Sequence, residues 1–107
     1  MATQNKITIY RAEDIVLNFT MTPTTDITGW TLVFNVSESK NSATKLITNK
    51  ACSIVSAVAG TFTASLLTSD TNIAPGEYWW DVYRTNSGSV RCVAYGPFNV
   101  QAVAKFP

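Results

Sequence analysis

The chain contains no histidine among its 107 residues, and only 14% of its residues are charged. Histidine is the usual general base at neutral pH and the commonest metal ligand. Without it, a serine or cysteine nucleophile lacks its ordinary activating base. The stretch SESK (37–40) has Ser-x-x-Lys spacing but lies in an expected polar loop, and the 7 carboxylates are spread along the chain. We therefore expect no catalytic residues and no enzymatic activity.

Charge of one sign is also not concentrated anywhere. The net charge is +1, and the 8 basic residues are scattered along the sequence. Nucleic-acid binding needs a clustered basic surface, so no nucleic-acid partner is expected. Apolar runs are too short to cross a bilayer, and MATQNKITIYRAED (1–14) lacks the apolar segment of a signal peptide. We expect no membrane association and assembly in the cytoplasm of the producing cell.

Cysteine is scarce, because the sequence has only Cys52 and Cys92 and no Cys-x-x-Cys pair. A structural zinc site needs more nitrogen and sulfur ligands than this, and a calcium loop needs a tight run of oxygen ligands. No metal and no cofactor is therefore expected. We favour two buried free thiols, because a cytoplasmic protein stays reduced. A disulfide is the alternative if the strands that carry the two cysteines are neighbours.

What the sequence does have is alternation of apolar and polar residues with a period of two, the pattern of half-buried strands. The stretch SDTNIAPG (69–76) is expected to be a loop or one helical turn, and 37–43 a polar loop. A hairpin turn is expected at Asn86-Ser87-Gly88, and Pro97 is expected to shift the chain into a last strand. Strands are expected at 6–10, 14–20, 29–37, 44–50, 51–58, 61–67, 77–85, 89–95 and 98–103.

This many short strands, with turn signals at regular spacing, predicts an all-β fold, an antiparallel sandwich of about seven to nine strands. We expect a single domain over 1–107, with loose termini at 1–5 and 104–107. Parity places alternate residues of EYWWDVYRT (77–85) on the inner face, with Arg84 at the end of the strand where its charged group reaches water. The residues expected in the core are Trp30, Phe34, Tyr78, Trp80, Val82 and Phe98.

The opposite face of the same strand also carries large aromatic residues, and these are the candidate interface. Burying such a side chain stabilises a protein, so we expect something to cover these residues. Three kinds of cover remain open: a loop of the same chain, a neighbouring subunit or a ligand. Asp81 between them is expected to form a cross-strand pair with Arg84 or Arg91. The candidate interface residues are Trp79, Asp81, Tyr83 and Tyr95.

Four stretches follow one another in the order IYRAEDIVLNFT, ITGWTLVF, PGEYWWDVYRTNSGS and YGPFNV. In this order they resemble the small immunoglobulin-like domains of tailed-bacteriophage virions, notably the N-terminal domain of the baseplate upper protein family. The similarity covers nearly the whole chain. The matching residues are Glu13, Asp14, Phe19, Thr28, Gly29, Trp30, Pro75, Gly76, Tyr78, Trp80, Asp81, Val82, Gly96, Phe98 and Val100.

The resemblance implies an immunoglobulin-like sandwich and a non-enzymatic structural protein of a phage virion, assembled in the cytoplasm of the host bacterium. It implies other virion proteins as partners, either the major capsid protein or tail and baseplate proteins, and many copies or a homo-oligomer. Baseplate upper proteins carry a long extension after this domain, and this sequence stops at Pro107. A small accessory protein that decorates the capsid, or an adaptor in the tail, baseplate or fibre, is therefore expected. The alternative function is a carbohydrate-binding module that uses the outward aromatic residues.

Overall fold

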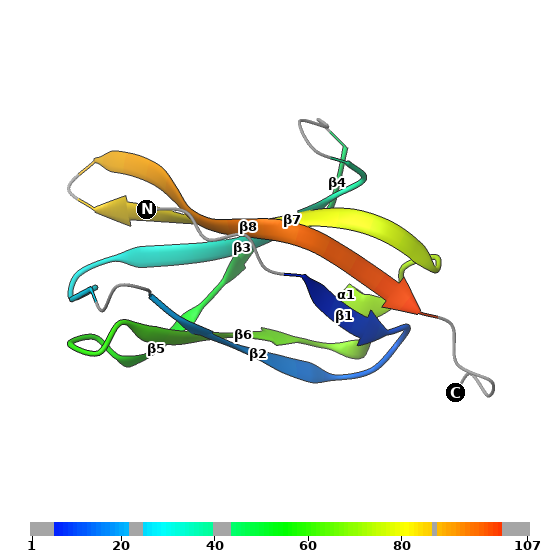
Figure 1. Cartoon of the computed structure of the whole chain (residues 1–107), viewed down its shortest axis with the longest axis horizontal. Coiled ribbons are helices and arrows are strands. Elements are labelled where there is room, and N and C mark those ends of the chain that lie inside the picture. The colour runs from blue at the N-terminus through cyan, green and yellow to red at the C-terminus, as the bar shows by residue number, and fades with distance from the viewer. Residues whose placement is uncertain (1–5, 22–24, 40–43, 87, 102–107) are drawn as a thin grey trace.

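The computed structural model describes residues 6–21, 25–39, 44–86 and 88–101. These residues form short strands and one helical turn (Figure 1). The predicted loose termini, and residues 40–43 of the predicted polar loop, lie outside the described residues. The elements are β1 (Ile7–Tyr10), β2 (Ile15–Thr20), β3 (Thr31–Ser37), β4 (Lys45–Ala51), β5 (Ser53–Ser56), β6 (Thr61–Leu66), α1 (Thr68–Thr71), β7 (Gly76–Asn86) and β8 (Ser89–Gln101).

The strands form two sheets that pack face to face, as Figure 1 shows, and the predicted all-β sandwich is confirmed. One sheet has five strands in the order β1-β8-β7-β3-β4, and the other has three in the order β2-β6-β5. The described strand pairs are antiparallel except for β1 and β8, which run parallel from Ile7 opposite Phe98 to Tyr10 opposite Gln101. This pair departs from the expected antiparallel arrangement. The turn after β1 moves the chain into the other sheet, so β1 pairs with the end of the chain instead of with β2.

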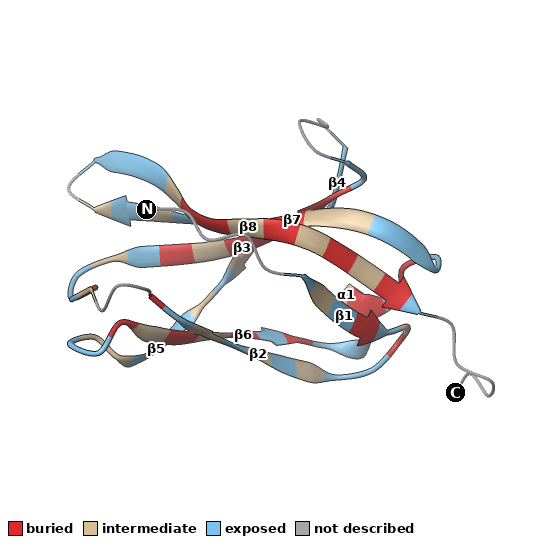
Figure 2. Cartoon of the chain, viewed as in Figure 1, coloured by how far each residue is buried: buried red, intermediate tan, exposed pale blue. Residues whose placement is uncertain are grey.

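The core between the sheets is built largely from aromatic rings. Phe19 of β2 stacks on Phe62 of β6, with 5.0 Å between ring centroids and 17° between the ring planes. Across the interior, the Phe19 ring lies 5.4 Å from Trp80 of β7, and Trp80 lies 6.0 Å from Phe34 of β3. Figure 2 shows buried positions alternating along the second half of β8, and the buried positions of β7 are Trp80 and Val82. Contacts between rings of both sheets therefore hold the two layers together.

The residues expected in the core occupy two environments. Trp80 is 1% exposed, and Phe34, Val82 and Phe98 are fully buried. Trp30 and Tyr78 are half-buried and pack against the edge of the core. The parity argument for the inner face of β7 therefore agrees with the burial of its side chains.

The strand order matches an immunoglobulin domain, in which strands B, E and D pack on a sheet that contains G, F, C and C′. Here β2, β6 and β5 correspond to the first set, and β8, β7, β3 and β4 to the second. Immunoglobulin strand F carries a tyrosine two residues before its disulfide cysteine, and that hydroxyl binds backbone a few residues upstream. The Tyr78 hydroxyl donates to the Ala74 carbonyl at 2.5 Å, and Trp80 occupies the cysteine position. The Phe19–Trp80 ring contact lies between β2 and β7, the two strands that correspond to those joined by the inter-sheet disulfide of antibody domains.

The prediction of a break at Pro97 is wrong, because β8 continues through this residue. Proline has no N–H to donate and is tolerated in a strand where one edge is unpaired. Pro97 lies opposite Trp79 of β7, whereas the pairing of β8 with β1 begins only at Phe98. Within the described residues, therefore, no strand pairs with β8 at Pro97 on the side away from β7. Asn86 pairs with Ser89 across the predicted hairpin turn, of which Ser87 lies outside the described residues, and Gly88 adopts φ +80°, as expected.

The connection from β1 to β2 is fixed against α1 at one end of the sandwich. The Asp14 carboxylate accepts hydrogen bonds from the Thr68 backbone N–H at 2.7 Å and from the Thr68 hydroxyl at 3.0 Å. The Thr71 hydroxyl, which is fully buried, donates to the Glu13 carbonyl at 2.8 Å. The acidic pair that contributed to the phage resemblance thus has a structural role here, in attaching β2 to the turn before β7.

Candidate functional site

The four candidate interface residues lie together on the outer face of the five-stranded sheet. Trp79, Asp81 and Tyr83 alternate along β7, and Asp81 lies directly opposite Tyr95 of β8. The ring centroids of Trp79 and Tyr95 are 5.9 Å apart, with 34° between the ring planes. We call Trp79, Tyr83 and Tyr95 the outer aromatic cluster. It is held on the two strands that form the longest ladder of the domain.

A β-bulge places Tyr95 in this cluster. Near the hairpin turn Tyr83 faces Cys92, but after the bulge Val82 faces Ala94 and Asp81 faces Tyr95, so that β8 contains one extra residue, Val93. Without the extra residue, Asp81 would face Ala94 and Tyr95 would point to the inner face, because a one-residue shift exchanges the two faces of a strand. Val93 and Ala94 are 3% and 7% exposed. The bulge thus brings Tyr95 beside Asp81.

Exposure differs among these residues. Tyr83 is 36% exposed, and Trp79, Asp81 and Tyr95 are half-buried. Beneath them, Asn35 and Ser37 of β3 are only 2% and 7% exposed although they lie on the outer face, so neighbouring side chains cover them. The outer face is therefore a packed layer of rings over polar groups.

Asp81 does not pair with Arg84 or Arg91, and that prediction is wrong. Its carboxylate accepts a hydrogen bond from the Asn35 side-chain amide at 3.1 Å. Arg84 lies on the opposite face of β7, where its guanidinium stands 4.9 Å from the centre of the Trp30 ring, and Arg91 lies opposite Arg84. Residues three positions apart along a strand point to opposite faces of the sheet, so Arg84 does not share a face with Asp81. Arg91 does not share it either, because it is paired with Arg84.

Burial raises the pKa of the Asp81 carboxyl above its ordinary value, and the bond from Asn35 and the charge of Lys45 on β4 only partly offset this. Burial, followed by the nearby charge of Asp81, also raises the pKa of the Tyr83 hydroxyl. Asp81 is thus a poorly solvated carboxylate on an otherwise aromatic surface.

Sequence analysis missed Asn35, which positions Asp81. The Asn35 side-chain oxygen accepts a hydrogen bond from the Asn49 backbone N–H at 2.7 Å, where β4 is irregular and Asn49 adopts φ 51°. Asparagine is uncommon inside strands, and its place between two core positions, Phe34 and Val36, was the available signal. Asn35 therefore ties β3, β4 and β7 together beneath the candidate interface.

The two cysteines are free and lie on different sides of the five-stranded sheet. Cys52 is half-buried against the core, and burial raises the pKa of its thiol to about 11. Cys92 is half-buried beside Tyr83 on the outer face, and burial also raises the pKa of its thiol. Both thiols are therefore protonated at neutral pH, a state that is a poor nucleophile.

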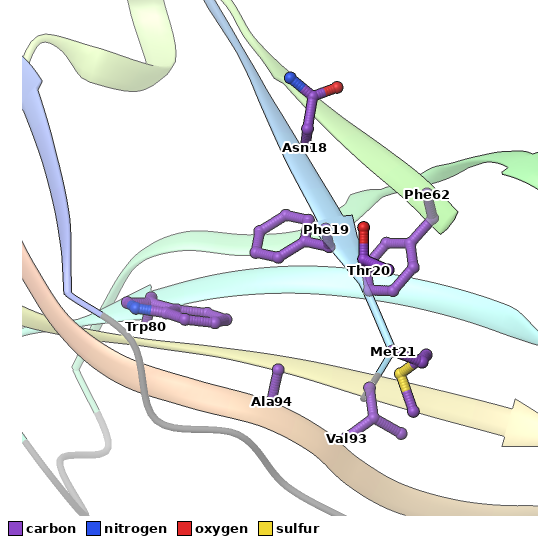
Figure 3. A pocket seen from close by; sticks show the side chains of 8 residues that line it. All are labelled: Asn18, Phe19, Thr20, Met21, Phe62, Trp80, Val93 and Ala94. Atoms are coloured by element: carbon purple, nitrogen blue, oxygen red, sulfur yellow. The ribbon is translucent and has the colours of Figure 1, made fainter. Parts of the chain in front are cut away.

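A pocket with a volume of about 90 Å³ lies between β2 and β8, at the open side of the sandwich (Figure 3). Figure 3 shows the rings of Phe19 and Phe62 on one side of it and Ala94 and Val93 on the other, with Met21 beside Val93. Its lining residues are Asn18, Phe19, Thr20, Met21, Phe62, Trp80, Val93 and Ala94, none of which is ionisable. The lining offers apolar contact and a few polar groups, but no acid or base.

Within the described residues, side chains that bind metals do not gather in groups of three or more. In the same ranges, no helix has the length and apolar character that crossing a bilayer demands.

No protein-family model matches the chain, and no curated protein matches it in sequence. Its structure is similar to that of the NK cell receptor Nkp44, a triggering partner in natural cytotoxicity, with a TM-score of 0.51 and 16% identity over 94% of this chain and 100% of that one. It is also similar to part of a candidate glycoside hydrolase from Bacteroides vulgatus, with a TM-score of 0.52 and 14% identity. That match covers 95% of this chain but only 17% of the other. Such low identities show the fold alone, and the chain is an all-β, immunoglobulin-like sandwich.

Proposed function

We propose that the protein is a non-enzymatic structural component of a tailed-bacteriophage virion that binds neighbouring virion proteins through the outer face of its five-stranded sheet. The observation that carries the binding role is the outer aromatic cluster around Asp81, three large rings held on paired strands. Aromatic residues are enriched at protein interfaces, and those near the centre carry much of the binding energy. The virion setting rests on the resemblance of the sequence motifs to phage immunoglobulin-like domains.

The low content of charged residues, 14%, supports binding between proteins. Interface centres are depleted of charge because each buried charge must be desolvated. An outer face with three rings and one poorly solvated carboxylate loses little hydration when a partner covers it.

The test is incorporation of variants into virions of the phage that encodes the chain. Trp79→Ala combined with Tyr83→Ala removes two rings of the cluster, and we expect occupancy, measured by mass spectrometry, to fall to background. The control is Val16→Ala, which removes an apolar side chain that is 55% exposed on the outer face of the three-stranded sheet, and it should keep wild-type occupancy. Normal occupancy of the double variant would refute the proposed surface. The copy number in wild-type particles separates a capsid position, with hundreds of copies, from a tail or baseplate position, with far fewer.

Carbohydrate binding is the second candidate, because paired rings beside a hydrogen-bonding carboxylate also suit a sugar. The pair here is Trp79 and Tyr95, with Asp81 opposite Tyr95. A glycan array probed with the isolated chain distinguishes the two functions. Specific glycan binding that the double variant loses would favour the second candidate, and an array without signal would count against it.

A further inference from the structure

Asp81 is a short side chain surrounded by long ones. Along β7, Trp79 and Tyr83 stand two residues to either side on the same face, at about 6.7 Å from the rise of a strand. Across the sheet, Tyr95 faces it from β8 and Asn35 from β3, at the roughly 5 Å spacing of paired residues. An aspartate carboxylate ends closer to the backbone than the rings of tryptophan and tyrosine. The negative charge therefore lies below the level of three ring systems.

The charges that face Asp81 in the described residues leave its carboxylate poorly compensated. The positive charge of Lys45 on β4 attracts the carboxylate, but Lys45 is exposed. A carboxylate has about four acceptor positions, and the Asn35 amide donates one hydrogen bond to it. The other titratable neighbours are Tyr95 on β8, together with Tyr83 on β7 and Cys92 on β8; burial raises the pKa values of Tyr83 and Cys92, so these two side chains carry no charge at neutral pH. The site therefore combines a carboxylate with acceptor capacity and ring faces whose quadrupoles attract cations.

We propose that Asp81 and the outer aromatic cluster bind an arginine side chain of the partner protein, an inference that rests on the proposed function and specifies its partner chemistry. A guanidinium is planar, donates two parallel hydrogen bonds to a carboxylate and stacks on aromatic rings. A cation is attracted by a ring within about 6 Å of its centroid, and the ring in direct register with Asp81 is that of Tyr95, opposite it on β8. Arginine is also less strongly hydrated than lysine, so it loses less on entering a site lined by rings.

The experiment uses the whole chain and a small probe, N-acetylarginine methylamide, with the lysine and citrulline analogues for comparison. Citrulline has nearly the shape of arginine but no charge. Titration followed by amide and indole NMR signals should show shifts centred on Trp79, Asp81 and Tyr95. We expect the arginine probe to bind about tenfold more tightly than the citrulline probe, the ratio expected for one charge-assisted hydrogen bond. Equal affinity for the two probes, or tighter binding of lysine, would overturn the inference.

Two variants test whether the preference for the arginine probe over the citrulline probe depends on the Asp81 carboxylate. Asp81→Asn keeps the shape of the side chain and an acceptor for Asn35, and it should remove the preference for arginine over citrulline. Asp26→Asn, which removes the charge of an exposed carboxylate outside the five-stranded sheet and keeps an acceptor for Thr28, should leave the preference unchanged. The affinity of the wild-type chain for the arginine probe should also fall as the ionic strength rises, a test that needs no variant. An Asp81→Asn chain that keeps the preference would refute the role of the carboxylate.

The arginine inference and the proposed virion function can be refuted independently of each other. If the Trp79→Ala, Tyr83→Ala chain loses virion occupancy while Asp81→Asn keeps the probe preference, the proposed function stands and the arginine inference fails. If the wild-type chain prefers the arginine probe but the double variant occupies virions normally, the arginine site stands and the proposed virion surface fails.

Discussion

Replacing Phe19 by alanine should remove the principal contact between the two sheets. Its ring stacks on Phe62 at 5.0 Å and lies 5.4 Å from Trp80 and 6.1 Å from Phe34, so it touches rings of both layers. A buried phenylalanine replaced by alanine costs about 3–5 kcal/mol. Because Phe19 is half-buried and not fully buried, we expect the lower end, about 3 kcal/mol. That is a large part of the roughly 5–15 kcal/mol by which such a domain is stable.

Urea unfolding followed by tryptophan fluorescence measures this loss, because Trp80 is buried beside the deleted ring. At about 4 °C per kcal/mol, the melting temperature should fall by about 12 °C. Phe19→Leu retains most of the apolar volume and should cost only about 1 kcal/mol. Val16→Ala is the control, since Val16 lies on the outer face of the same strand and is 55% exposed; it should change stability by less than about 0.5 kcal/mol. A loss below about 1 kcal/mol for Phe19→Ala would show that other contacts hold the sheets together.

Three further substitutions, with Tyr83→Phe as a comparison, test hydrogen bonds and charge. Asp81→Asn should raise the free energy of unfolding at neutral pH: burial raises the pKa of this carboxyl, so the folded chain binds the proton more tightly than the unfolded chain. As the pH falls through the raised pKa toward 3.8, the free energy of unfolding of the wild-type chain therefore rises relative to that of the variant. Unfolding curves measured at the low end of this range should show no remaining advantage of the variant. Tyr78→Phe should cost about 1 kcal/mol in thermal unfolding because the Ala74 carbonyl loses its donor, whereas Tyr83→Phe should change little. Asp14→Ala should cost about 1 kcal/mol and speed hydrogen exchange at the Thr68 amide, and unchanged exchange would contradict the capping role.

Period-two alternation was enough to predict the sandwich and the inner face of β7. The burial of Trp80 and Val82, and the outward position of Trp79 and Tyr83, follow from parity within one strand. Parity needs no knowledge of which strand lies alongside, because each residue is placed only relative to its own neighbours in sequence.

Relations between strands were not predictable in the same way. The extra residue Val93 decides that Tyr95 faces outward beside Asp81, and no simple sequence pattern marks such a bulge. The partner of Asp81 is Asn35, 46 positions away, and its identity depends on the pairing of β3 with β7. The break expected at Pro97 failed for a related reason, since proline interrupts a strand only where its missing N–H is needed.

The parallel pairing of β1 with β8 has a mechanical consequence. The chain enters this pair at Ile7 and leaves it at Gln101, so tension applied through the two ends slides one strand along the other and strains the ladder bonds of all the paired residues together. If the terminal strands were antiparallel and pulled at one end of the pair, their ladder bonds would instead break one after another. A domain with this geometry resists unfolding under tension, a property set by how slowly it unfolds and not by its equilibrium stability.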